Sequence, residues 1–139
     1  MEKGVIERAS FLSMIIVSAV IVGVIAARVI DLEKDYNLRD PTYEEAMQFI
    51  RSDQTDKNQY NQSYTCINFA NDFRYNALNE GYRCGYVAIE FGETSHAIVC
   101  FNTSDNGLIF IEPQSDEIVT LTTEQPYLGE IILRFSIIW

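Results

Sequence analysis

Residues 64–81 read YTCINFANDFRYNALNEG and contain the pattern that decides the fold. From Cys66 onward, apolar residues recur at intervals of three and four, which predicts one face of an amphipathic helix buried in a core. These positions are Cys66, Phe69, Ala70, Phe73 and Ala77. The Asn-Glu-Gly step that follows predicts the helix end, because Gly81 can adopt the left-handed conformation of a helix cap.

A shorter helix is predicted upstream of this segment. Thr42 and Glu45 have the spacing of a capping box, in which each side chain bonds to the backbone amide of the other residue. Apolar residues at 46, 47, 49 and 50 continue the helix to about Asp53. Residues 53–63 are almost entirely polar, so we expect them to form a loop.

Strand-like apolar runs follow the second helix. They occupy residues 82–91, 95–101, 107–112 and 130–138, with a weaker run at 117–121. Residues 92–94 (Gly-Glu-Thr) and 104–107 (Ser-Asp-Asn-Gly) predict hairpin turns between the first three runs. Helices followed by an antiparallel meander predict an α+β fold, with the N-terminal helices packed on an antiparallel β-sheet.

Residues 9–27 form a run of nineteen residues without a charge. A helix of that length covers roughly 28 Å, close to the hydrocarbon thickness of a bilayer. We therefore expect residues 1–30 to be a membrane anchor with one transmembrane helix, and residues 31–139 to be a single domain outside the cytoplasm. A cleaved signal segment is the alternative, because Lys3 and Arg8 precede the run and Val24-Ile25-Ala26 fits a cleavage site.

The composition of residues 31–139 excludes several function classes. Seven Lys and Arg residues stand against eighteen Asp and Glu, a net charge of −11, so we expect no nucleic-acid partner. We expect no cofactor and no metal, since a Gly-rich phosphate loop and a zinc-type Cys/His spacing are both absent from the sequence. Cys84 and Cys100 fit either a disulfide or two buried reduced thiols.

Three residues have the chemistry and the order of a thiol-hydrolase site. Cys66 begins the predicted helix, where free amides and the helix dipole favour a thiolate. His96 is the only histidine in the chain and opens the second strand. Glu112 ends the third strand, immediately before Pro113. The three side chains predict a nucleophile, a base and a group that orients the base.

The surrounding motifs resemble the transglutaminase-like domains of the papain-like cysteine hydrolase superfamily. They are YTCINFANDF around Cys66, GYRCGYV at 81–87, SHAIV around His96 and IEPQ around Glu112, and together they cover about residues 60–115. The resemblance implies a Cys-led helix on an antiparallel sheet, with a base and an acid on successive strands. Because the family's acid is usually Asp, Asp116 is a second candidate. Gln62 is a candidate oxyanion donor beside the preferred Cys66 amide.

The resemblance implies a membrane-anchored, extracytoplasmic cysteine hydrolase that acts on a protein or peptide substrate. Peptidase or amidase activity is expected ahead of acyl transfer, because the sequence contains no recognisable site for an acceptor amine. The alternative is a catalytically inactive transglutaminase-like module that displays a binding surface at the membrane. The sequence predicts neither the oligomeric state nor the identity of the substrate.

Overall fold

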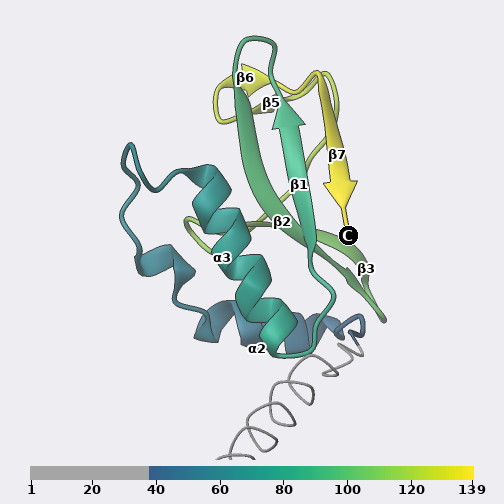
Figure 1. Ribbon diagram of the computed structural model, residues 1–139. Coiled ribbons are helices and arrows are strands. Elements are labelled where there is room, and N and C mark those ends of the chain that lie inside the picture. Colours follow the sequence, from purple (N-terminus) through teal and green to yellow (C-terminus); the bar gives the residue numbers. More distant parts are fainter. Residues whose placement is uncertain (1–37) are drawn as a thin grey trace, which may run out of the picture. The chain divides into compact units, whose positions relative to one another are not determined.

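Two helices and an antiparallel sheet dominate residues 38–139, the part of the chain that the computed structural model describes (Figure 1). The predicted α+β class, with N-terminal helices packed on an antiparallel sheet, is confirmed. The predicted membrane span at residues 9–27 lies outside the described residues. Among residues 38–139, no helix has the length and apolar character needed to cross a bilayer.

Helix α2, Tyr43–Ser52, begins at the predicted capping box. The Glu45 amide donates to Thr42 Oγ1 at 3.2 Å, and the Thr42 amide donates to Glu45 Oε2 at 2.8 Å. After α2, a short 3₁₀ helix, η1 (Thr55–Lys57), replaces part of the expected loop. Asp53 explains this difference, because its carboxylate accepts hydrogen bonds from the Thr55 amide and from Asn76 on the next helix.

Helix α3, Cys66–Asn79, has the boundaries that the sequence predicts. At its start, Asn68 Oδ1 accepts from the Thr65 amide at 2.9 Å. At its end, Gly81 has a φ of 84°, and its amide donates to the Leu78 carbonyl. Only glycine adopts this conformation without a steric penalty, so the helix stops there.

The main sheet has five strands in the order β4-β3-β2-β1-β7, and every neighbouring pair is antiparallel. Its strands are β1 (Gly85–Glu90), β2 (Ser95–Thr103), β3 (Gly107–Glu112), β4 (Glu117–Val119) and β7 (Arg134–Ile138). A separate two-stranded ribbon consists of β5 (Pro126–Tyr127) and β6 (Glu130–Ile131).

The prediction of one strand over residues 130–138 is wrong. Glu130 and Ile131 belong to the ribbon, whereas residues from Arg134 onward pair with β1 at the far edge of the main sheet. The break lies between them, where the Ile132 amide donates to the Gln125 carbonyl and the Leu133 amide to the Glu90 carbonyl. The first hydrogen bond holds the end of β6 to the residue before β5, and the second ties the segment between β6 and β7 to β1 of the main sheet.

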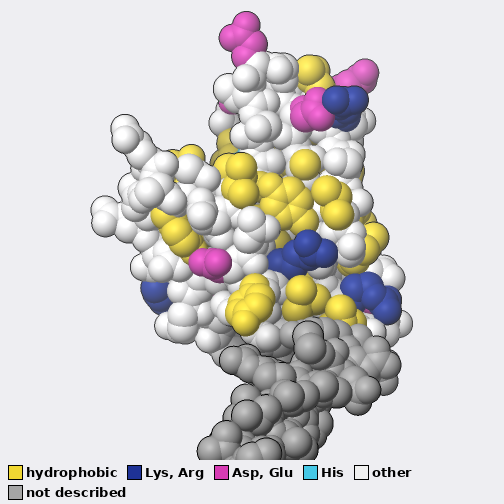
Figure 2. Space-filling view, viewed as in Figure 1, with side chains coloured by type: hydrophobic (Ala, Val, Ile, Leu, Met, Phe, Trp, Pro, Cys, Tyr) yellow, Lys and Arg dark blue, Asp and Glu magenta, His cyan; other side chains and the backbone are white. Residues whose placement is uncertain are grey.

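Successive side chains of β2 point to opposite faces of the sheet and contribute to two apolar clusters. Ala97, Val99 and Phe101 pack with α2 and α3 in what we call the helix-side cluster. Ile98 and Cys100 belong to the second cluster, together with Val87, Ile89, Leu121 and Ile132. Figure 2 shows further apolar side chains gathered on the surface beside α3.

Candidate active site

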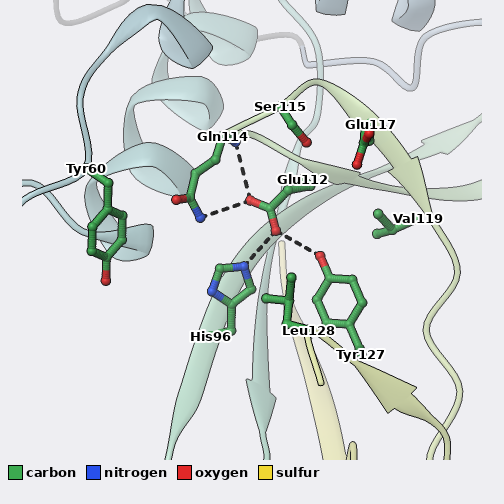
Figure 3. A pocket seen from close by; sticks show the side chains of 9 residues that line it. All are labelled: Tyr60, His96, Glu112, Gln114, Ser115, Glu117, Val119, Tyr127 and Leu128. Atoms are coloured by element: carbon green, nitrogen blue, oxygen red, sulfur yellow. Dashed lines mark hydrogen bonds and ion pairs between the residues drawn. The ribbon is translucent and has the colours of Figure 1, made fainter. Parts of the chain in front are cut away.

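A pocket of about 480 Å³ opens where β2, β3, β4 and the β5–β6 ribbon come together (Figure 3). Its lining residues are Tyr60, His96, Glu112, Gln114, Ser115, Glu117, Val119, Tyr127 and Leu128. Two of the three residues predicted for the active site, His96 and Glu112, therefore line the same cavity.

His96 and Glu112 are in direct contact, as their predicted roles of base and orienting group require. His96 Nε2 lies 2.7 Å from Glu112 Oε2, and both side chains are about nine-tenths buried. The strand register explains this contact. Val99 pairs with Ile111, so Ile98 is opposite Glu112, and His96 lies two residues away on the same face. In neutral imidazole, this hydrogen bond places the proton on Nε2. Nδ1 then has a free lone pair and can accept a proton from another group.

The Glu112 carboxylate is held by three residues. Besides the contact with His96, Oε2 accepts from the Tyr127 hydroxyl at 2.8 Å, and Oε1 accepts from the Gln114 amide and side chain at 3.3 and 3.2 Å. Burial acts to raise the pKa of Glu112, but His96, Tyr127 and the Gln114 amide outweigh it and hold that pKa below its ordinary value. The carboxylate is therefore ionised and fixed in position.

The sequence interpretation missed Tyr127, which contacts both members of the pair. Its ring centroid lies 6.1 Å from that of His96, and its hydroxyl donates to Glu112. Burial raises the pKa of Tyr127, and the hydrogen bond and negative charge of Glu112 raise it further, so the phenol stays protonated. Tyr127 comes from the short ribbon, which has no motif that links it to the strands carrying His96 and Glu112. Gln114 was part of the quoted IEPQ motif but received no role.

We expect Tyr127→Phe to lower kcat/KM about tenfold, because it removes a hydrogen bond to a charged group. Loss of that donor also raises the pKa of Glu112 toward its ordinary value. A carbon NMR titration of the Glu112 carboxyl measures this pKa shift. If Tyr127 has a purely structural role, Tyr127→Phe leaves the pKa of Glu112 unchanged. Tyr60→Phe is the matched control, since Tyr60 lines the same pocket but its hydroxyl makes no hydrogen bond to the described residues.

Cys66 begins α3, as predicted, and is half-buried. It packs against the helix-side cluster, and its thiol lies close enough to Tyr86 to raise the pKa of that phenol beyond the effect of burial. Among residues 38–139, no hydrogen bond joins Cys66 to His96 or Glu112, and Cys66 does not line the pocket. Tyr60 connects the two regions, because it lines the pocket and stacks on Phe69 of α3.

Asp116 does not contact His96, so the structure gives the second candidate acid no orienting role. Burial and the neighbouring carboxylates of Asp56 and Asp53 raise the pKa of Asp116 to about 6. Its main chain has a φ of 60°, and its amide donates to the Glu112 carbonyl. Among the two candidate acids, Glu112 is the one that the strand register brings to the imidazole.

Gln62 lies in the exposed turn between Asn61 and Tyr64. Its side chain neither lines the pocket nor hydrogen-bonds within the described part of the chain. The Cys66 amide is better placed as an oxyanion donor, because the first amides of a helix have no intrahelical acceptor.

Cys84 and Cys100 are both free and buried. Cys84 belongs to the helix-side cluster and Cys100 to the second cluster, so the two thiols do not form the disulfide that the sequence left open. Burial raises the pKa of Cys84 well above its ordinary value and that of Cys100 to about 12. Both thiols are therefore protonated and poorly reactive. Within residues 38–139, no group of His, Cys, Asp or Glu side chains is arranged to hold a metal ion.

Comparison with known proteins gives similarity of fold alone. No family model and no curated protein matches the sequence. Polyporus squamosus lectin, solved with a human-type influenza-binding epitope, is similar with a TM-score of 0.52 and 17% identity, over 59% of this chain and 34% of that chain. A PSL1a–E64 complex gives a TM-score of 0.49 and 17% identity, over 58% and 37%. The match thus spans only about a third of each of those proteins.

Proposed function

We propose that this chain is a transglutaminase-like cysteine hydrolase that cleaves amide bonds in proteins or peptides. The observation that carries this proposal is the 2.7 Å contact between His96 Nε2 and Glu112, which leaves the second imidazole nitrogen free to act as a base. Cys66 at the start of α3 is the nucleophile, and Glu112 fixes the tautomer and orientation of His96.

The reaction begins when the Cys66 thiol gives its proton to His96 Nδ1. The thiolate sulfur then adds to the substrate carbonyl carbon, while the Cys66 amide donates to the developing oxyanion. His96 returns the proton to the leaving amine as the carbon–nitrogen bond breaks, which gives a thioester. Water, deprotonated by His96, hydrolyses the thioester and restores the thiol.

This mechanism requires the Cys66 thiol and His96 Nδ1 to come within hydrogen-bonding distance when substrate binds. Catalytic hydrogen bonds are commonly long before the substrate is present and tighten in the complex. Hydrolysis is proposed ahead of acyl transfer, because water can resolve the thioester without a second substrate site. We propose further that residues 9–27 anchor the enzyme in the cell membrane with its catalytic domain outside the cytoplasm.

Thiol labelling tests whether His96 activates Cys66. In the detergent-solubilised full-length chain, we expect iodoacetamide at neutral pH to modify Cys66 at least about tenfold faster than Cys84 and Cys100, whose protonated thiols are buried. His96→Ala is expected to slow the labelling of Cys66 and leave the other two unchanged. Peptide mapping by mass spectrometry measures all three rates in one sample.

A second candidate function is a non-catalytic binding module with the same fold. The observation that favours it is that the Cys66 thiol has no hydrogen bond to His96 within the described residues. Equal labelling of Cys66 in the parent and in His96→Ala, together with no hydrolysis of any peptide, supports this module and contradicts the hydrolase.

A further inference from the structure

The pocket beside His96 has two carboxylates on one wall. Glu112 and Glu117 are directly opposite each other in the β3–β4 pair, so both side chains point to the same face of the sheet. Like charges in this arrangement repel unless each one is compensated. Figure 3 shows both carboxylates among the side chains that line the cavity.

The two carboxylates differ in their hydrogen-bond partners. Both oxygens of the Glu112 carboxylate are hydrogen-bonded, to His96, Tyr127 and Gln114. Glu117 is exposed, and its carboxylate has no hydrogen bond or ion pair with any other residue that the structure describes. Its negative charge reaches the pocket, because it contributes to the raised pKa of Tyr127. Glu117 is therefore the acid of this pocket that remains available to a ligand.

The rest of the lining is mainly apolar and accessible. Tyr60 is 57% exposed and Leu128 is 65% exposed, and Val119 also lines the cavity. No Lys or Arg lines the pocket within residues 38–139, where six basic residues stand against fifteen acidic ones. A volume of about 480 Å³ accommodates a large side chain. Such a cavity suits a group with an apolar stem and a positively charged end.

We propose that this pocket is a substrate subsite that binds a long basic side chain, with its aliphatic stem against Leu128, Val119 and Tyr60 and its cationic end at Glu117. The proposal rests on the proposed hydrolase function and names its substrate class. An acidic side chain is repelled by both carboxylates, and a purely apolar one would remove water from Glu117 without replacing its hydrogen bonds. Arginine and lysine meet both requirements of the cavity.

Matched peptides that differ only in arginine or citrulline test the proposal, because citrulline has nearly the same shape without the charge. We expect the full-length chain to cleave the arginine peptide with a kcat/KM roughly twofold to fivefold higher, which is the range for an exposed charge pair. Glu117→Gln is expected to bring the ratio close to one, and Glu117→Lys to reverse it. Glu44→Gln, an equal charge change at an exposed position on α2, should keep the parent ratio.

A binding measurement tests the proposed subsite independently of catalysis. Fluorescence anisotropy of the same labelled peptides with full-length Cys66→Ala compares their affinities without turnover. Preferential binding of arginine that Glu117→Gln abolishes supports the subsite, even where no peptide is cleaved and the hydrolase proposal fails. Equal affinities for arginine and citrulline, or a preference that survives Glu117→Gln, overturn the subsite while leaving the hydrolase proposal intact.

Discussion

Cys66→Ala is expected to lower peptide hydrolysis by the full-length chain by at least about 10⁴-fold, because no other group can form the thioester. Cys66 is only half-buried at the start of α3, so replacing its thiol with hydrogen leaves little cavity. We therefore expect the melting temperature to change by no more than about 4 °C. Hydrolysis of a fluorogenic peptide and a thermal melt followed by circular dichroism measure the two effects.

Cys84→Ala is the matched control for this prediction. Cys84 is 1% exposed in the helix-side cluster, so its truncation should cost about 1–3 kcal/mol of stability. Cys84 is not among the residues that line the pocket, which predicts an unchanged kcat at a temperature where the variant stays folded. If Cys66→Ala and Cys84→Ala hydrolyse peptides equally well, Cys66 is not the nucleophile.

The parts of the fold that were predictable from sequence are those that local interactions determine. The capping pair Thr42 and Glu45 and the left-handed Gly81 act within one or two helical turns, so their spacing alone located both helices. The long strands β2 and β3 have continuous apolar runs and a tight turn between them. Their positions were therefore predicted closely, although β2 continues to Thr103.

The ribbon and the last strand were not separable in the sequence. Residues 130–138 include enough apolar side chains to look like one strand, but the break at Ile132 and Leu133 depends on bonds to Gln125 and Glu90. Glu90 lies more than forty residues earlier in the chain. The residue pattern of 130–138 holds no information about a hydrogen bond to a residue outside this segment. The sequence therefore did not predict where the strand would break.

The candidate site also combines contacts that local sequence predicts with contacts that depend on tertiary packing. The sixteen-residue step from His96 to Glu112 crosses a single hairpin, so the sequence was sufficient to predict their contact. Tyr127 reaches the same carboxylate from the ribbon, whose position depends on the whole sheet. Cys66 is located by its helix cap, but its relation to His96 depends on how α3 packs on β2. Helix packing of this kind has no signature in residue spacing.

Glu112→Gln is expected to lower kcat by about 10²- to 10⁴-fold while keeping the shape of the side chain. In the parent, the carboxylate accepts a hydrogen bond from the Nε2–H group and so leaves Nδ1 unprotonated to act as the base. An amide in the same place can donate through its nitrogen, which favours the tautomer with the proton on Nδ1. NMR of His96, the only histidine in the chain, distinguishes the two tautomers directly.

Stability should depend on pH in a way that identifies the same carboxylate. The pKa of Glu112 is lower in the folded protein than its ordinary value, so its ionised form stabilises the fold above about pH 4.3. That contribution is lost as the pH falls through the lowered pKa, where the carboxylate is protonated in both states. The parent should therefore exceed Glu112→Gln in melting temperature at neutral pH, and the difference should shrink in acid.

Asp116→Asn separates the role of Glu112 from a general effect of removing an acid near the pocket. Burial and the repulsion of Asp56 and Asp53 raise the pKa of Asp116, so its charge destabilises the folded state at neutral pH. Asparagine removes the charge and tolerates the left-handed φ of 60° at this position. We expect unchanged kcat and an equal or higher melting temperature. A loss of activity in Asp116→Asn beside an active Glu112→Gln would assign the orienting role to Asp116, and the contact between His96 and Glu112 would then be structural.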